Sequence, residues 1–454
     1  MVSSLSPLTG WGRGPGRLGR VRTPAAHDDL GRAVRSASAC APITVRGSGL
    51  SYGDAALPAV EGGQVLDMSS RTRLVDLDLD GGVAVVQSGL TLRRLTALAA
   101  PHGWRVPVLP GAADVTVGGA IASDVHGKNQ PGAGSFGEHV DWMTLLQPDG
   151  SGVRLSPSQD PGGFWATVGG LGLTGVIDLV AVRLAPATAR TAVRHRLRAG
   201  TLTETLSVVE SLSRRQQHDP QLHVAAWLDA TGGGGRGRAL VDVCRPADGA
   251  DAPPSVTRRR GRRFPSLPGA GVIGRPTIRA ADAGHWWLTS TGRGQLVPMD
   301  KALLPLDAIG WWPGAFGSLG LVQYQLLLPG DAVDQLETVL DVLRRQRVPP
   351  ALAVLKRFTG SAAAPLGFAD AGWSMALDFP RRWSGLEPAL QHLDDLVADH
   401  GGRVYLTKDS RLDADHVEAM YPRLHEWRRD RDRLDPTGAM TSNLGVRLGL
   451  VPAS

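Results

Sequence analysis

The chain of 454 residues is too long for a single hydrophobic core of ordinary size, so we expect two packed domains with a ligand site at their interface. Hydrophobic residues make up 42% of the chain and charged residues 20%, which is typical of a globular protein, and 58 glycines with 32 prolines predict many tight turns. The formal net charge of +6 suits an anionic substrate, a membrane surface or nucleic acid, although arginine in place of lysine throughout also gives a basic chain without any site.

The two cysteines, Cys40 and Cys244, stand far apart without partners at metal-ligand spacing. This spacing excludes a disulfide framework and a zinc site, and both thiols are expected to be buried. The first residues lack the apolar run of a secretory signal, and no stretch of about 18 apolar residues predicts a membrane span. We expect a soluble or peripheral protein, cytoplasmic or at the membrane surface, with the periplasmic face left open.

Short β-branched runs alternate with Gly, Pro and Asp turns between residues 40 and 182. Strands are predicted at residues 41–47, 63–68, 82–89, 115–123 and 175–184. Residues 90–103 have apolar residues at helical spacing and end at Gly103, which predicts a helix with a glycine stop. This is an α+β pattern without a regular βαβ repeat.

Three glycine-rich segments interrupt these elements, at 46–54 (RGSGLSYGD), 110–128 and 164–177. Glycines let several backbone N–H groups point at one anion, and a diphosphate matches such a surface. Three of these segments in one half of the chain favour a nucleotide site over ordinary turns. GLGLTG at 170–175 fits a nicotinamide site, but a strand-like run follows it where that site needs a helix.

The second half begins after a stretch of mixed composition. Residues 232–268 contain a glycine run, a proline pair and the basic cluster RRRGRR, and the part at about 246–268 is predicted to be a mobile loop. The basic cluster is either solvated or faces anionic lipid headgroups. It lacks the interleaved aromatics that stack bases, so we expect no nucleic-acid partner.

Helices and strands alternate in the rest of this half. Amphipathic helices are predicted at 332–347 and 386–402, and strands at 321–329, 351–358 and 373–380. We expect an antiparallel sheet covered by helices on one side. The predicted division is a first domain at 1–188, a second at 189–400, and a segment at 401–454 that returns to the first domain.

Several polar residues of the second half could contact a substrate. Lys356 lies in a strongly apolar strand, where an unpaired charge is costly, so it should have an anionic partner that is either an internal carboxylate or a ligand. Gln323 and Gln325 face one side of their strand and could bind sugar hydroxyls or cross-link strands. Lys408 could stabilise charge near a cofactor or pair with Asp409 at the surface.

Taken together, RGSGLSYGD, PVLPGAADVTVGGAIASDVHGKN and FWATVGGLGLTGVI resemble the FAD domain of the vanillyl-alcohol oxidase (PCMH-type) class of flavoproteins. TGWGR, VHGKN with AGSFG, LVQYQ, YLTKDSR and AMYPRLHEW narrow the resemblance to the decaprenylphosphoryl-β-D-ribose 2-oxidase family. The resemblance implies a two-domain PCMH-type FAD-binding fold. Its motifs extend over almost the whole chain.

The resemblance also implies site residues. To FAD it assigns Arg46, Gly47, Ser48, Gly49, Leu50, Ser51, Tyr52, Gly53, Asp54, Ala55, Gly111, Thr116, Val117, Gly118, Gly119, Ser123, Asp124, Val125, His126, Ile177 and Tyr405. To the substrate it assigns Lys128, Gln323, Gln325, Lys356, Ser374, Ala376 and Lys408, with Lys408 and His126 expected to do the chemistry.

Three positions depart from the wider pattern. Many members of the class attach FAD through a histidine in the first loop, whereas Leu50 stands at the matching place and predicts non-covalent FAD. Members of the narrower family carry a cysteine, captured by nitroaromatic inhibitors, where this chain has Ala376, so such capture should fail here. Their asparagine is replaced by Ser374, which alters the expected substrate contacts.

The implied activity is FAD-dependent oxidation of the 2′-hydroxyl of a polyprenylphosphoryl-β-D-ribose to the 2′-keto sugar. An NAD(P)H-dependent keto-reductase would complete epimerisation to the arabinose donor for cell-wall arabinan, and peripheral membrane contact would suit the lipid substrate. The alternatives are an FAD oxidase for a free alditol or sugar lactone, and a non-catalytic flavin-binding protein.

Overall fold

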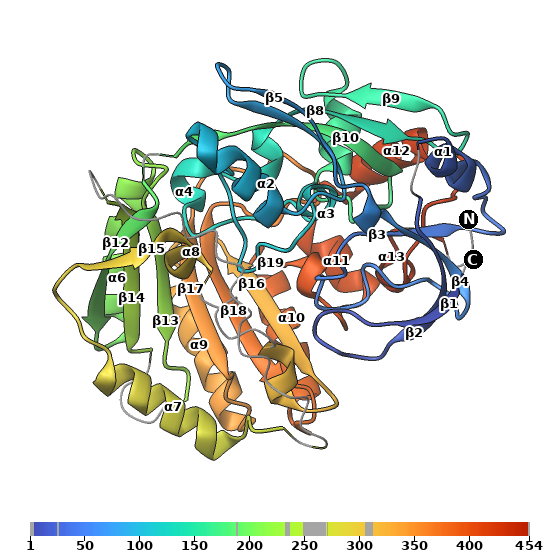
Figure 1. Ribbon diagram of the computed structural model, residues 1–454. Coiled ribbons are helices and arrows are strands. Elements are labelled where there is room, and N and C mark those ends of the chain that lie inside the picture. The colour runs from blue at the N-terminus through green and yellow to red at the C-terminus, as the bar shows by residue number, and fades with distance from the viewer. Residues whose placement is uncertain are drawn as a thin grey trace.

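The computed structural model describes residues 4–24, 27–187, 189–231, 237–247, 269, 271–304 and 312–452. The predicted mobile loop at about 246–268, with its RRRGRR cluster, lies almost wholly outside these residues. Figure 1 shows a five-stranded sheet at the top of the molecule and an eight-stranded sheet at the lower left, with the short helix α3 (Val117–Ala122) between them.

Two main sheets and one short antiparallel pair, β7 (Trp104–Arg105) with β11 (Ala185–Pro186), form the N-terminal half. In the four-stranded sheet an antiparallel pair continues into two parallel strands, in the order β1 (Ser4–Leu8), β2 (Arg17–Arg22), β4 (Gly63–Asp67) and β3 (Ile43–Arg46). The five-stranded sheet is antiparallel, in the order β5 (Leu74–Asp78), β6 (Val83–Gln87), β10 (Val176–Arg183), β8 (Val140–Leu146) and β9 (Gly152–Leu155). The strands predicted at 41–47, 63–68, 82–89 and 175–184 are confirmed as β3, β4, β6 and β10. Because β10 directly follows GLGLTG, that segment has no helix on which a nicotinamide site could be built.

The predicted helix at 90–103 is confirmed, and the predicted strand at 115–123 is wrong. Helix α2 (Leu92–Ala99) begins at a cap from Thr91, and Gly103 ends the following turn with a left-handed φ of 80°. Residues 117–122 form α3 instead of a strand, because the Thr116 hydroxyl accepts the Gly119 N–H at 3.1 Å and caps a short helix. The β-branched residues around this cap suggested a strand, but the cap and the small residues Gly118, Gly119 and Ala120 favour the turn.

An antiparallel eight-stranded sheet dominates the second half. Its order is β15 (Gln295–Pro298), β12 (Thr191–Ala199), β14 (Ala239–Pro246), β13 (His223–Leu228), β17 (Leu352–Phe358), β18 (Gly372–Pro380), β16 (Leu321–Leu328) and β19 (Arg403–Val404). The strands predicted at 321–329, 351–358 and 373–380 are confirmed, as are the two amphipathic helices, which are α9 (Val333–Arg345) and α10 (Leu386–Asp399).

The two faces of this sheet differ because side chains alternate along each strand. On β17, Leu355 packs into the main core, whereas Val354 and Lys356 line a cavity on the opposite face. Helices α6 (Leu202–Gln216), α9 and α10 contact one another in series and cover the core face. The α+β fold with a helix-covered antiparallel sheet is therefore confirmed, and the exact domain limits stay a prediction.

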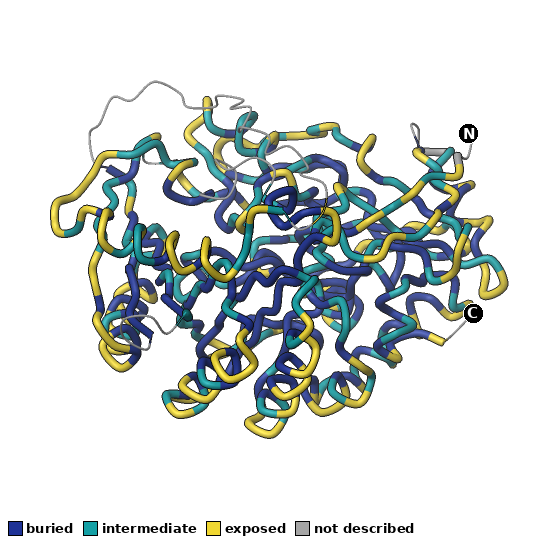
Figure 2. The backbone as a smooth tube through the Cα atoms, turned by 90° about the horizontal axis from the view of Figure 1, so that it is seen from below, coloured by how far each residue is buried: buried dark blue, intermediate teal, exposed yellow. Residues whose placement is uncertain are grey.

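The C-terminal segment packs against the N-terminal half. Trp427 on α12 (Leu424–Leu434) donates to the Ala166 carbonyl at 2.9 Å, at the end of α5 (Pro161–Thr167). Met440 forms a bridge with Ile43 on β3. Figure 2 shows that the buried segments run through the middle of the molecule, with exposed turns along its rim.

The cysteines differ in burial. Cys244 on β14 is buried as predicted, but Cys40 is exposed, so the prediction that both are buried is wrong for Cys40. Cys40 lies in the turn between α1 (His27–Arg35) and β3, and this turn lies outside the packed core. Among the described residues, no helix is both long and apolar enough to cross a membrane.

Candidate active site

A cavity of about 960 Å³ separates the glycine-rich segments from the open face of the eight-stranded sheet. This volume lies at the upper end of the range of about 300–1,000 Å³ for small-molecule and cofactor sites. Most of the predicted site residues line it, namely Gly47, Ser48, Gly49, Leu50, Ser51, Tyr52, Ala55, Gly111, Thr116, Gly118, Gly119, Ser123, Val125, His126, Lys128, Ile177, Gln323, Gln325, Lys356, Ala376, Tyr405 and Lys408. The cavity wall does not include Arg46, Gly53, Asp54, Val117, Asp124 or Ser374.

The first glycine-rich loop offers free backbone donors. Within the described part of the chain, the amide N–H groups of residues 48–51 donate to no protein atom. Gly47 allows this close packing, because a Cβ there would lie 2.3 Å from the Thr116 hydroxyl, and Gly49 adopts a left-handed φ of 64°. Consecutive free N–H groups on a concave backbone are a surface for an anion such as a diphosphate.

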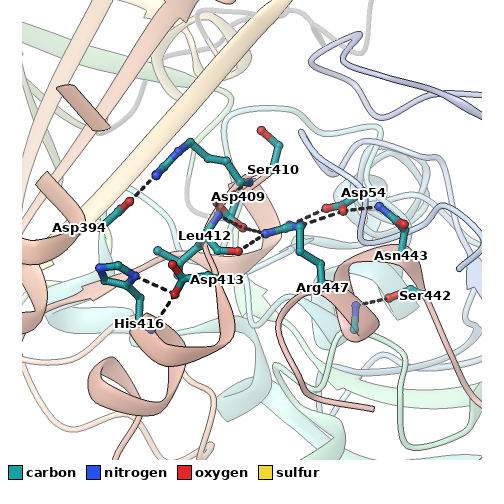
Figure 3. Close-up of polar contacts among 12 residues, drawn as sticks. Asp54, Asp394, Asp409, Ser410, Leu412, Asp413, His416, Ser442, Asn443 and Arg447 are labelled. Atoms are coloured by element: carbon teal, nitrogen blue, oxygen red, sulfur yellow. Dashed lines mark hydrogen bonds and ion pairs between the residues drawn. The ribbon is translucent and has the colours of Figure 1, made fainter. Parts of the chain in front are cut away.

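Two charged residues of this loop support it from behind. The Arg46 guanidinium donates to the carbonyls of Thr9 at 3.0 Å and Ala56 at 3.1 Å. The Asp54 carboxylate accepts from Arg447 at 2.8 Å and from Asn443 at 2.6 Å, as Figure 3 shows. These residues therefore fix the loop in place and do not line the cavity.

The second glycine-rich segment shapes the cavity wall but offers few free backbone N–H donors. The Val117 and Gly118 amides donate at 2.8 Å to the carbonyls of Leu90 and Ser88, respectively, in the turn that precedes α2, and the Gly119 amide donates to Thr116. Val117 itself is core, and burial raises the pKa of the Asp124 carboxyl to about 7 while it accepts from the Gly137 amide at 3.0 Å. Gly111, by contrast, has no atom within 4 Å of the place where a Cβ would stand. This side of the cavity is a glycine surface against which a flat ligand can lie.

His126 lies at the junction of the two halves. Its ring contacts Phe358 and Phe368 of the sheet domain and Tyr405, with centroids between 4.9 and 5.4 Å apart. The Gln325 amide nitrogen lies 3.0 Å from His126 Nε2. Burial, together with the positive charges of Lys356 and Lys408, lowers the pKa of His126 well below its usual value. The imidazole is therefore neutral near pH 7 and is a weaker base than an ordinary histidine.

Three lysines project into the cavity. Lys128 donates to the Ala302 carbonyl at 2.9 Å, while Lys356 and Lys408 form no ion pair with any described residue. Asp409, the alternative partner of Lys408, pairs with Arg447 at 2.8 Å. Burial, with the charges of Lys408 and Lys128, lowers the pKa of Lys356 to about 7, and burial lowers that of Lys408 to about 8 against the influence of Asp378.

The lysines are also conspicuous in the composition. The whole chain contains only four lysines, Lys128, Lys301, Lys356 and Lys408, and uses arginine for every other basic position apart from histidine. Three of the four line the cavity. Arginine stays charged in proteins, whereas a lysine can lose its proton when buried, so a lysine at these positions allows chemistry that arginine does not.

The two glutamines cross-link strands and line the cavity at the same time. Gln325 on β16 donates to Ser374 on β18 at 2.9 Å, and Gln323 donates to the buried Asp378 carboxylate. Ser374 therefore lies behind Gln325, whereas Ala376 faces the cavity. Asp378 also accepts from the Trp312 indole at 2.8 Å, so an ordered polar group lies beneath the cavity floor.

The cavity extends farther than the sequence suggested, to β12–β14 and to α7 (Arg275–Leu288). Arg196, Trp227, Asp242, Asp282 and His285 line this arm, and none of them was a candidate. Arg196 pairs with Asp242 at 2.7 Å. One signal was available, since arginines alternate along residues 194–198, and a strand with a charged face requires water or a ligand beside it.

Buried polar atoms without a protein partner gather at the cavity. Within the described part of the chain these include His126 Nδ1 and Oε1 of both glutamines on one side, and the hydroxyls of Ser88 and Thr407. Unpaired buried polar atoms are costly, so they indicate a bound polar molecule. Together with the free loop amides and the glycine surface, these hydrogen-bonding groups fit an FAD molecule. A lysine-rich compartment remains beside it.

Comparisons with known proteins agree with this geometry. Residues 19–156 match a family described as an FAD binding domain. Decaprenylphosphoryl-beta-D-ribose oxidase of Mycolicibacterium smegmatis is 35% identical over 98% of this chain and 97% of its own length. An uncharacterised protein of Streptomyces coelicolor is 33% identical over 80% of this chain and its full length. D-lactate dehydrogenase of Archaeoglobus fulgidus is 32% identical, but over only 32% of this chain and 33% of its own length.

Proposed function

Because the chain belongs to the decaprenylphosphoryl-β-D-ribose oxidase family of PCMH-type FAD-dependent oxidoreductases, we propose that it oxidises the 2′-hydroxyl of a polyprenylphosphoryl-β-D-ribose to the 2′-keto sugar. The substrate loses a proton from oxygen and a hydride from carbon. An NAD(P)H-dependent keto-reductase would then reduce the ketone to the arabinose epimer. Oxygen or a quinone-like acceptor would reoxidise the enzyme.

The lysine-rich compartment is the observation that carries this proposal. Lys356 and Lys408 form no ion pair with a described carboxylate, although both line the cavity and burial lowers the pKa of each. Burying unpaired cations is costly unless an anionic ligand compensates them. A sugar bearing a phosphodiester fits this requirement, and the amides of Gln323 and Gln325 offer partners for its hydroxyls.

Bound FAD would supply the hydride acceptor. The chain's own residues would handle the proton. The Lys408 ammonium can stabilise negative charge on the hydroxyl oxygen, and neutral His126, although a weak base, can take up the proton as that charge develops. Gln325 orients the imidazole through its 3.0 Å contact and is itself fixed by Ser374. We assign Lys408 and His126 to the chemistry and the other cavity lysines to substrate binding.

Anaerobic reduction of the flavin tests the proposal. We expect a polyprenylphosphoryl ribose to bleach the flavin absorbance of the holoenzyme, whereas ribose, alditols and sugar lactones should not. Bleaching by a free alditol or lactone would instead identify an oxidase of soluble sugars. If no compound of either class bleached the flavin, the protein would be a non-catalytic flavin-binding protein.

The value of kcat/KM should fall as pH rises from 6 to 9. A lysine is charged below its pKa, so Lys356 loses its charge near pH 7 and Lys408 near pH 8 in the free enzyme. We expect kcat/KM for a phosphate-bearing substrate to fall roughly tenfold over this range, since a charge-assisted contact is lost. A pH-independent kcat/KM, measured from the rate of flavin reduction, would contradict the roles of Lys356 in binding the phosphate and of Lys408 in the chemistry.

The flavin should be dissociable. Leu50 lines the cavity in the first loop, and its side chain has no nucleophile that could form a bond to the flavin ring. Acid precipitation of the holoenzyme should therefore leave a colourless pellet and a yellow supernatant. Yellow colour retained in the washed pellet would show a covalent link and would require an attachment residue elsewhere.

A further inference from the structure

The cavity reaches the protein surface beside helix α7. Asp282 and His285 lie one helical turn apart on α7, and both line the cavity. Asp282 is buried, whereas His285 is exposed, so the wall of the cavity continues to the outside along this helix. The His285 ring packs edge-on against Trp227 of β13, with centroids 4.6 Å apart. A ligand too long for the cavity could leave it here.

The end of α7 next to this opening carries unusually exposed apolar side chains. Leu288 is 85% exposed and Trp287 71%, and Leu296 on the following strand β15 is 66% exposed. These are the three most exposed large apolar residues of the described chain, and they fall within nine residues of one another. Single exposed apolar residues are ordinary, but Trp287 and Leu288 are adjacent at the end of α7, two and three residues beyond the cavity-lining His285, and such a pair indicates an interaction surface. Leu296 lies farther along the chain, opposite Val193 of β12.

This apolar group is held in a fixed position. Trp286, the neighbour of Trp287, lies under the Arg238 guanidinium at 4.8 Å, and Arg198 donates to the Trp286 and Thr289 carbonyls at 2.9 Å. The inner side of the helix end is thus attached to the sheet. Trp287 and Leu288 consequently point outward from a rigid support.

The charge around the group is positive. Arg275, Arg279 and Arg293 are exposed between residues 275 and 298, and the single acidic residue of that segment, Asp282, is buried. Burial and the nearby Asp229 raise the pKa of Asp282 to about 8, so it is neutral near pH 7. Exposed tryptophan and leucine on a segment whose exposed charged residues are all arginines match the interface of a bilayer that contains anionic lipids.

We infer that Trp287 and Leu288 dock the protein on an anionic membrane surface, which sets the mouth of the cavity against the bilayer. A prenyl-chain substrate could then present its phosphosugar to the cavity while its tail remains in the lipid. This inference rests on the proposed function for the identity of the substrate. The docking itself rests on the exposed side chains and the charge.

The test uses the holoenzyme and its Trp287→Ser/Leu288→Ser double variant, with Leu5→Ser as the matched control. Leu5 is 60% exposed on β1, at the opposite end of the molecule in Figure 1. We expect the wild type and the control to co-sediment with vesicles of phosphatidylglycerol and phosphatidylcholine. The partition coefficient of the double variant should fall about tenfold or more, and that of the wild type should fall in high salt.

Flavin reduction by two substrates gives the second readout. With long-chain polyprenylphosphoryl ribose in vesicles, the double variant should be slowed in proportion to its lost binding. A short-chain, water-soluble analogue should reduce the flavin of both proteins equally, which shows that the variant is folded. Failure of that analogue with the wild type would reject the proposed function, while the sedimentation result would still decide the docking.

Two results would overturn the inference. One is a wild type that stays in the supernatant with anionic vesicles, or a double variant that sediments as the wild type does. The other is a dimer, seen by analytical ultracentrifugation, that the double substitution converts to monomer without changing vesicle binding. That outcome would place a second copy of the chain on this surface.

Discussion

Replacing Lys408 with alanine should lower the rate of substrate-driven flavin reduction about 100- to 1,000-fold, because removing one preorganised group that stabilises developing negative charge costs this much in other enzymes. Lys408 lies in a cavity wall with Tyr52 and Tyr405, whose ring centroids are 5.5 and 5.9 Å from its Nζ. Asp378 is the opposite charge that acts on it, and it lies beneath the floor. The positive charge is therefore directed to the cavity.

The control for Lys408→Ala is Lys301→Ala. Lys301 is the one lysine outside the cavity wall, and its side chain is exposed on α8 (Met299–Leu303). Both variants should retain FAD, as judged from the visible spectrum, and only Lys408→Ala should lose flavin reduction under anaerobic stopped-flow conditions. If Lys408→Ala reduced its flavin within threefold of the wild type, Lys408 would have no part in the chemistry.

The elements that could be predicted from sequence are those with a clear apolar run or a clear period. Strands β16 and β18 are apolar runs buried along almost their whole length, and the 3.6-residue period of α9 and α10 reflects one buried face, so sequence alone located them. Residues 115–123 were predicted as a strand because Val and Ile favour strands intrinsically. In the structure, the N-cap from Thr116 stabilises a helix there. A six-residue helix is too short to show a period.

The candidate site shows the same division between local and long-range information. Motifs identified the loops around Gly47 and His126, because each is continuous in sequence. The arm near Arg196 and His285 is built from β12–β14 and α7, which only the fold brings together. Roles within the first loop could not be separated either, since Arg46 and Asp54 are supports at the two ends of the loop whose residues 47–52 line the cavity.

The ion pair of Asp54 is made with a residue almost four hundred positions away. Arg447 on α13 (Asn443–Arg447) bridges Asp54 and Asp409, at 2.8 Å to each carboxylate, and also donates to the Leu412 carbonyl. Figure 3 shows the guanidinium between the two carboxylates. The Asp409 side chain is 2% exposed and that of Asp54 is 11% exposed. Together they connect the first glycine loop, the Lys408 turn and the C-terminal helix.

Replacing Arg447 with methionine should therefore lower the free energy of unfolding by about 3 kcal/mol, because it leaves two buried carboxylates unpaired. The estimate is at the lower end of the range since a quarter of the Arg447 side chain is exposed. FAD should also bind more weakly, because the loop of residues 48–51 loses its anchor. Urea unfolding of each variant measures the effect. Arg429→Met, at a 70% exposed arginine of α12, should change the free energy of unfolding by no more than about 0.5 kcal/mol. Equal midpoints for the two variants would mean that water satisfies Asp54 and Asp409 as well as Arg447 does.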